Sequence, residues 1–175
     1  MKSLDISVLI LEDNHQMRML MTTILNGLGI RQVSGAECVD EAIDRCLHNQ
    51  YDIFLVDQLL RGRDSGLRFV KWLRMSGESR APMAPVITIS SFSERSRIIE
   101  AINAGVDEFL VKPLRPVDMA RRIQAVGMKR RKFVRTGDYF GPCRRRLPVP
   151  ANFTGPYRRA DDMVDQDDDL MFELD

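Results

Sequence analysis

Five short apolar segments alternate strictly with five amphipathic ones in the first 127 residues, and this alternation limits the possible folds more than any other feature. The apolar segments are residues 6–11, 31–34, 53–56, 85–89 and 108–111, and the amphipathic segments are residues 15–26, 39–47, 66–75, 94–104 and 116–126. Short apolar runs predict buried strands, whereas apolar residues at helical spacing predict helices. Strands that alternate with helices form a parallel sheet covered on both faces. The sequence therefore predicts a doubly wound α/β fold.

Charge divides the chain into three parts. Residues 1–127 hold 16 basic and 16 acidic side chains, residues 128–160 hold 10 basic and 1 acidic, and residues 161–175 hold 8 acidic and no basic ones. Blocks of like charge are typical of tails and interaction segments rather than of compact cores. We therefore predict one domain over residues 1–127 and a charged, irregular and non-globular extension over residues 128–175.

The composition favours a cytoplasmic protein. No apolar run approaches the ~20 residues of a membrane span, and the first residues lack the features of a signal peptide. Three cysteines (Cys38, Cys46 and Cys143) have no metal-ligand spacing, and we interpret them as reduced thiols.

Polar residues that can carry chemistry follow four of the five predicted strands. Glu12 and Asp13 follow the first, Asp57 the third, Ser90 the fourth and Lys112 the fifth. Ligand sites of doubly wound sheets lie beyond the carboxyl ends of the strands, so these residues should meet at one edge. Clustered carboxylates repel unless a cation neutralises them, and oxygen ligands suit Mg²⁺. A carboxylate can attack phosphorus to give an acyl phosphate, whose oxygens a lysine and a hydroxyl can hold.

Taken singly, each of these residues also has an ordinary structural role. The pair Glu12-Asp13 can begin a helix, Asp57 can form a cap or turn, and Lys112 can be a surface lysine. Their joint placement at four strand ends, in this order, favours a shared functional site.

The segments around these residues resemble the signature of the bacterial two-component response-regulator receiver family. They are Leu11-Glu12-Asp13-Asn14, Val56-Asp57, Ile89-Ser90-Ser91 and Val111-Lys112-Pro113, and the similarity extends over about residues 5–127. The resemblance implies a five-stranded flavodoxin-like sheet with strand order 2-1-3-4-5. It also implies a phosphoacceptor signalling protein rather than an enzyme, with Mg²⁺-dependent self-phosphorylation.

The resemblance implies a role for each residue of the metal and phosphoryl site. Asp57 would receive a phosphoryl group from a sensor histidine kinase or a histidine phosphotransfer protein. Asp13 and Asp57 would bind Mg²⁺ directly, together with the backbone carbonyl of Leu59, whereas Glu12 would act mostly through water.

A second set of residues would form the switch. The resemblance makes Ser90 the switch hydroxyl, Lys112 its cationic partner and Phe109 the aromatic side chain that follows the hydroxyl. Phe109 can equally be a plain core residue of the fifth strand. The Lys112–Pro113 peptide bond is expected to be cis, as is typical of the family.

The chain departs from the family pattern near the phosphoacceptor. Leu60-Arg61 replaces the frequent Met-Pro, and one extra residue lies in the loop over residues 62–66. Leu59 and Phe92 occupy the positions that flank the path of the hydrolytic water in the family. Because two apolar side chains position no water, we predict slow self-dephosphorylation.

The extension contains one pattern twice, 14 residues apart: an aromatic residue, a spacer, Gly-Pro, a spacer and Arg-Arg. The copies consist of Tyr139, Gly141, Pro142, Arg144 and Arg145, and of Phe153, Gly155, Pro156, Arg158 and Arg159. Gly-Pro argues against regular helix or strand. The pattern could be a docking motif for a partner or for the domain's own surface, a solvated tail, or a contact for nucleic acid or an anionic membrane.

We interpret the chain as a stand-alone response regulator that signals through protein–protein contacts with an unidentified target. The residues after Gly127 lack the apolar pattern of a helix-turn-helix core. One alternative is a phosphotransfer intermediate or phosphate sink. Another is a nucleic-acid-binding regulator that uses the basic segment, which the following acidic segment disfavours. The sequence leaves open whether two copies pair as a homodimer.

Overall fold

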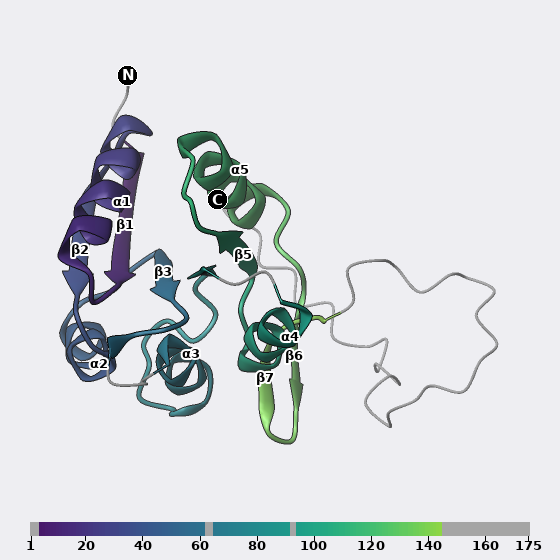
Figure 1. The fold of residues 1–175 in the computed structure, drawn as a ribbon. Coiled ribbons are helices and arrows are strands. Elements are labelled where there is room, and N and C mark those ends of the chain that lie inside the picture. The colour runs from purple at the N-terminus through teal and green to yellow at the C-terminus, as the bar shows by residue number, and fades with distance from the viewer. Residues whose placement is uncertain (1–3, 62–64, 92–93, 145–175) are drawn as a thin grey trace. The chain divides into compact units, whose positions relative to one another are not determined.

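The computed structural model describes residues 4–61, 65–91 and 94–144 (Figure 1). Its main sheet is parallel and consists of β1 (Leu4–Leu11), β2 (Ile30–Ala36), β3 (Ile53–Asp57), β4 (Val86–Ser90) and β5 (Glu108–Val111). The strand order is β2-β1-β3-β4-β5, which confirms the predicted fold.

Five helices cover the two faces of this sheet: α1 (His15–Gly27), α2 (Val39–His48), α3 (Gly66–Met75), α4 (Arg95–Ala104) and α5 (Pro116–Met128). Successive residues of a strand point to opposite faces. Val8 and Ile10 accordingly pack in one core with α1 and α5, and Leu9 and Leu11 in another with α2, α3 and α4. Figure 1 shows these two groups of helices on opposite sides of the sheet.

Helix α4 buries only two small residues. Its N-cap residue, Glu94, makes no capping hydrogen bond through its side chain, and its buried residues are only Ala101 and Ala104. The larger Ile99 is 45% exposed. Since most helical stability in proteins comes from the packing of an apolar face, α4 has little to fix its position.

The compact unit extends beyond the predicted boundary at Gly127 and ends at Arg144. It includes an antiparallel hairpin of β6 (Phe133–Thr136) and β7 (Tyr139–Pro142). The expectation that Gly-Pro would prevent a strand was therefore wrong for the first copy of the repeated pattern. Cys143 N–H donates to Lys132 O at 2.7 Å, so the adjacent Phe133–Pro142 pair is a non-hydrogen-bonded one. Pro142 needs no N–H at this position.

Charged and aromatic side chains attach the hairpin to the domain. Asp107, 3% exposed, accepts hydrogen bonds from Arg74 at 2.9 Å and from Arg130 at 3.2 Å. Arg131 donates to the backbone oxygen of Asp107 at 2.6 Å. The guanidinium groups of Arg74 and Arg130 lie 5.0 and 4.5 Å from the ring centre of Phe133. These contacts join α3, the start of β5 and the hairpin.

The first copy of the repeated pattern makes its contacts within this unit. The Tyr139 hydroxyl donates to Pro142 O at 2.7 Å, and the Arg144 guanidinium lies 4.1 Å from the Tyr139 ring centre. A β-carbon on Gly141 would lie 2.9 Å from Cα of Gly105, so only glycine allows this approach. The last residue of this copy, Arg145, lies outside the described residues. So does the second copy, formed by Phe153, Gly155, Pro156, Arg158 and Arg159.

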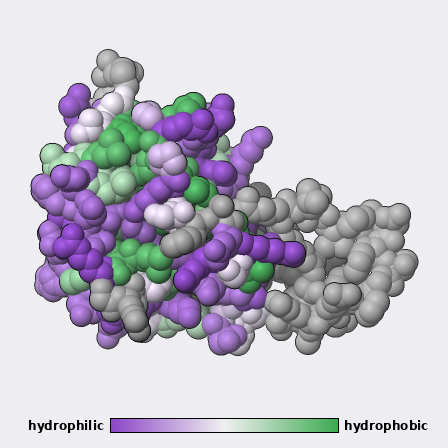
Figure 2. Space-filling view, viewed as in Figure 1, coloured by the Kyte–Doolittle hydropathy of each residue, from purple (hydrophilic) through white to green (hydrophobic). Residues whose placement is uncertain are grey.

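The surface in Figure 2 is mostly hydrophilic, with apolar residues in separate groups. No described helix is both long enough and apolar enough to span a bilayer.

Candidate functional site

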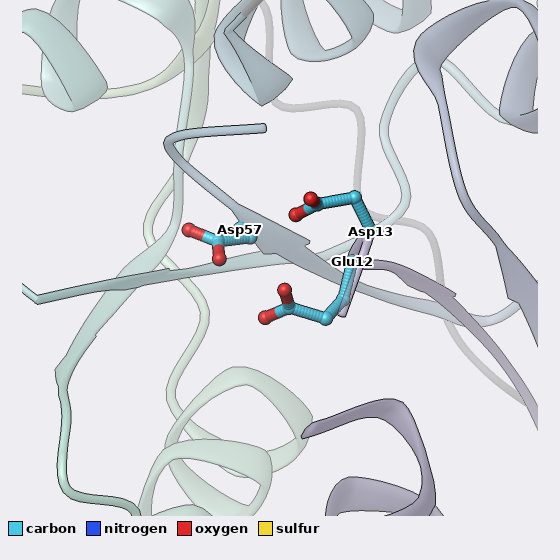
Figure 3. Close-up of side chains that lie close together, drawn as sticks. All are labelled: Glu12, Asp13 and Asp57. Carbon is cyan, nitrogen blue, oxygen red and sulfur yellow. The ribbon is translucent and has the colours of Figure 1, made fainter. Parts of the chain in front are cut away.

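Three carboxylates meet at the carboxyl ends of β1 and β3. Glu12 and Asp13 follow the last residue of β1, and Asp57 is the last residue of β3. One oxygen of each carboxylate lies within 4.8 Å of the others. Figure 3 shows the three side chains close together at this edge of the sheet. The structure thus brings together the three acids that the sequence placed at one site.

The local backbone explains where the two acids of β1 lie. Glu12 N–H donates to Ala36 O at 3.1 Å, which continues the pairing of β1 with β2 beyond Leu11. Asn14 then caps α1 by accepting from Met17 N–H at 3.1 Å. The chain turns between these two points, so Glu12 is buried at 1% exposure and Asp13 lies nearer the surface.

Lys112 joins two of the acids. Its Nζ donates to Oε2 of Glu12 at 2.9 Å and to Oδ2 of Asp57 at 2.6 Å. Its backbone N–H donates to Ser90 O at 2.9 Å, which holds the end of β5 beside the end of β4. The Lys112–Pro113 bond is cis, as predicted. One ammonium group thus lies between two buried carboxylates.

Burial and the shared lysine have opposite effects on the acids. Burial, the hydrogen bond with Asp57 and the negative charge of Asp57 raise the pKa of Glu12 to about 7, although Lys112 opposes the rise. Burial alone would lower the pKa of Lys112, but its hydrogen bonds to Asp57 and Glu12 raise it above its usual value. Lys112 therefore stays charged at neutral pH, and the site holds a proton or a cation readily.

The backbone around Asp57 is tightly packed. The N–H of Leu59 donates to Oδ1 of Asp57 at 3.0 Å. A β-carbon on Gly66, the first residue of α3, would lie 2.0 Å from the backbone oxygen of Asp57 and 2.6 Å from Cγ1 of Val56. Glycine at this position is what lets α3 begin directly against the end of β3.

The remaining predicted residues lie around this cluster. Ser90, the last residue of β4, is 1% exposed, and Phe109 in β5 packs half-buried against the core beneath α3 and α4. Leu59 is 38% exposed. Phe92 lies outside the described residues, as does most of the loop with the predicted extra residue, residues 62–64.

Two further residues belong to the site by position. Arg61 Nε lies 2.9 Å from Oδ2 of Asp13 and is 81% exposed, so it pairs with the outermost acid. Gln58, directly after Asp57, is fully buried. Arg61 entered the prediction only as a departure from a pattern, and Gln58 was not predicted. The available signal was a glutamine between Asp57 and the apolar pair Leu59-Leu60.

The donor set fits Mg²⁺. Among the described residues the cluster consists of three carboxylates without a histidine or cysteine, and hard oxygen ligands of this kind are what Mg²⁺ prefers. Asp13 and Asp57 would bind the ion, and Glu12 would act on it through water.

Comparison with known proteins identifies a family to which the chain is similar. Residues 8–124 match the model of the response regulator receiver domain. The transcriptional regulatory protein PhoB of the phosphate regulon of Escherichia coli (strain K12) is 29% identical over 119 residues, which cover 68% of this chain and 50% of that protein. ResD of Bacillus subtilis (strain 168), also a transcriptional regulatory protein, is 29% identical over 119 residues, covering 68% and 47%. The chain thus spans about half the length of these relatives.

Solved structures share the fold. The chemotaxis protein CheY4 of Vibrio cholerae has a TM-score of 0.63 at 22% identity, covering 72% of this chain and 99% of that one. The receiver domain of the Francisella response regulator 1452 has a TM-score of 0.62 at 24% identity, covering 70% and 96%.

Receiver domains are phosphoacceptor modules of two-component signalling that interact with histidine kinases or phosphotransfer proteins and bind Mg²⁺ at an acidic pocket. The match covers most of the chain, and an acidic cluster is present. The chain therefore belongs to the response regulator receiver domain family, whose members act in phosphorylation-dependent signalling.

Proposed function

We propose that Asp57 accepts a phosphoryl group from the phosphohistidine of a sensor histidine kinase or histidine phosphotransfer protein. The observation that carries the proposal is the arrangement of its carboxylate, which lies between the ammonium group of Lys112 and the acidic pair Glu12-Asp13. Asp57 is 5% exposed, so its carboxylate is held in place at the edge of the sheet.

The transfer forms one bond and breaks another. A carboxylate oxygen of Asp57 attacks phosphorus and the new O–P bond forms, while the P–N bond to the donor histidine breaks. The imidazole nitrogen leaves with the electron pair, and the histidine ring ends neutral because its other nitrogen already carries a proton or takes one from solvent. Lys112 lies close enough to hold the arriving phosphoryl oxygens. Mg²⁺, when bound, neutralises negative charge on those oxygens.

The modified site then acts on neighbouring strands. A phosphoryl group adds about −1.5 to −2 charge and three strong acceptors. Lys112 and the hydroxyl of Ser90 move toward these acceptors, and Phe109 follows in β5. The change reaches the surface of α4, β5 and α5, where Ile99, Val111 and Val117 are 45%, 42% and 51% exposed. A downstream protein or a second copy of the chain binds there.

Signalling through protein contacts suits this chain better than direct contact with nucleic acid. Arg130 and Arg131 in the basic segment are engaged with Asp107, and Arg144 lies on the Tyr139 ring. The named transcriptional role of PhoB and ResD belongs to proteins about twice as long as the matched region. We therefore favour a regulator that signals through protein contacts over a nucleic-acid-binding one.

The proposal is tested with purified protein, Mg²⁺ and acetyl phosphate, read out by intact mass. Wild type should gain the mass of one phosphoryl group, and Asp57→Ala should not. Asp44→Ala, which removes an exposed acid on α2, is the matched control and should be modified like wild type. Modification of Asp57→Ala to the wild-type extent, or no modification of wild type, would overturn the proposal.

A further inference from the structure

Gln58 occupies a junction between four elements. Its backbone N–H donates to Ile89 O in β4 at 2.9 Å. Its backbone oxygen accepts from Oγ of Ser65 at 3.2 Å and from N–H of Gly66 at 3.3 Å, at the start of α3. The peptide that follows the phosphoacceptor is therefore fixed from both sides, and the Gln58 side chain projects from a rigid base.

The side chain of Gln58 reaches across to α4. Its Nε2 donates to the backbone oxygen of Arg97 at 3.2 Å, in the first turn of that helix. Its Oε1 is buried and has no hydrogen-bond partner in the part of the chain that the structure describes. A fully buried amide that satisfies only half of its polar atoms costs stability, which favours a functional reason for the residue.

The hydrogen bond from Gln58 contributes strongly to the position of α4, because few residues of this helix are buried. The helix buries only Ala101 and Ala104, and the side chain of Glu94 does not cap it. Elements with few buried contacts open at low free energy. One buried hydrogen bond to the first turn is then a large share of what fixes that end of α4.

Ser90 is connected to the same end of α4 through the chain. Only residues 91–94 connect this last residue of β4 to the first residue of α4, Arg95. A movement of Ser90 toward a modified Asp57 therefore pulls on the start of α4. Gln58 holds the same turn from the side of β3, so a displacement of this turn on modification would break its hydrogen bond to Arg97.

We propose that Gln58 is a positioning residue that holds the first turn of α4 in its resting arrangement and so sets the threshold for the response to modification of Asp57. The inference rests on the proposed function of Asp57 and names a residue that regulates it. A hydrogen bond that is made only in the resting arrangement lowers the free energy of that arrangement. The equilibrium between the two arrangements then shifts away from the active one.

The test compares wild type with Gln58→Leu, which keeps the apolar bulk and removes the amide. The variant should bind beryllofluoride, a phosphoryl mimic, about fivefold more tightly in the presence of Mg²⁺. This corresponds to about 1 kcal/mol, the usual net value of one hydrogen bond. Amides of α4 should exchange with deuterium about fivefold faster in the unmodified variant. With beryllofluoride bound, exchange in α4 should be the same in both proteins.

Thr88→Val is the matched control. Thr88 in β4 also has a buried, unpartnered polar atom, Oγ1, among the described residues, and it is fully buried like Gln58. Thr88→Val should leave both the affinity for beryllofluoride and the exchange of α4 unchanged. If Gln58→Leu fails to fold, Gln58→Met carries the same expectations.

The outcomes separate the two proposals. Equal affinities of wild type and Gln58→Leu for beryllofluoride would overturn the role of Gln58, as would faster exchange of α4 without a gain in affinity. That second result would mean a purely structural hydrogen bond. Failure of wild type to bind beryllofluoride at all would overturn the function of Asp57 and this inference with it.

Discussion

Nζ of Lys112 lies 2.6 Å from Oδ2 of Asp57, in a pair whose side chains are 18% and 6% exposed. The same ammonium group is 2.9 Å from Oε2 of Glu12. Lys112 is thus the cation that makes two buried carboxylates tolerable when no metal ion is bound. Removal of one partner from a buried ion pair leaves the other charge uncompensated, which is more costly than the pair is worth.

We expect Lys112→Met to lower the free energy of unfolding by about 3 kcal/mol in the presence of a chelator. Mg²⁺ should restore part of the loss, because a bound cation neutralises the same carboxylates. Urea unfolding with and without Mg²⁺ measures both effects. Lys71→Met, which removes an exposed lysine of α3, should change little in either condition. A loss in Lys112→Met that Mg²⁺ leaves untouched would argue against this role of the lysine.

Gly66 should be essential for the position of Asp57. A β-carbon there would lie 2.0 Å from the backbone oxygen of Asp57, so Gly66→Ala must push α3 away from β3. We expect a destabilisation of about 3 kcal/mol and slower modification by acetyl phosphate. Gly27→Ala in α1 is the control, since a β-carbon there meets nothing within 4 Å. It should stabilise by about 0.5–1 kcal/mol. Equal unfolding midpoints for Gly66→Ala and wild type would contradict the expectation.

The sequence predicted the main sheet well because its strands are deeply buried. Every residue of β3 and β4 is buried, so β3 is a continuous apolar run up to Asp57 and β4 is a continuous uncharged run. The predicted bounds are accordingly close: the expected strand over residues 85–89 is Val86–Ser90. The rule that ligand sites lie at carboxyl strand ends then brought Glu12, Asp57 and Lys112 together.

The hairpin and the bond from Gln58 could not be predicted in the same way. Phe133–Thr136 and Tyr139–Pro142 are short and lie among many cations, and their stability comes from docking on Arg74 and Asp107. The hydrogen bond from Gln58 to Arg97 joins residues 39 apart in the sequence and depends on side-chain direction. The hydrogen bond is tertiary, and local propensity gives no sign of it. The hairpin did have a local signal, because Gly137-Asp138 separates two runs rich in aromatic and β-branched residues.

Gly141→Ala should release the hairpin. Its new β-carbon would lie 2.9 Å from Cα of Gly105, a backbone atom that cannot move aside. We expect trypsin to cut after Arg130, Arg131 or Lys132 much faster than in wild type, because these sites become accessible once the hairpin opens. Gly127→Ala adds a β-carbon in open space and should be cut like wild type. Indistinguishable digestion of the two variants would mean that the docking contributes little.

The cysteines should differ in reactivity. Burial raises the pKa of Cys46 to about 12 from a usual 9.0, whereas Cys38 is exposed. At pH 8 only about one part in 10⁴ of Cys46 is then thiolate, the reactive form. Iodoacetamide should therefore label Cys38 first and Cys46 only when urea unfolds the protein. The neutral thiol also stabilises the fold fully below pH 9, and this contribution is lost as pH rises toward 12. Rapid labelling of Cys46 in native protein would contradict its burial.

Leu59 should prolong the modified state of Asp57. Its N–H donates to Oδ1 of Asp57, and its apolar side chain offers no group that could position a hydrolytic water. Leu59→Asn adds such a group at a position that is 38% exposed and tolerates polarity. We expect the phosphorylated variant to lose its phosphoryl group about tenfold faster. This acceleration is smaller than the one that a general base provides, because an amide takes up no proton. Intact mass after removal of acetyl phosphate follows the decay. Leu47→Asn, at 36% exposure on α2, should decay like wild type. If Leu59→Asn also decays like wild type, a different feature controls the lifetime.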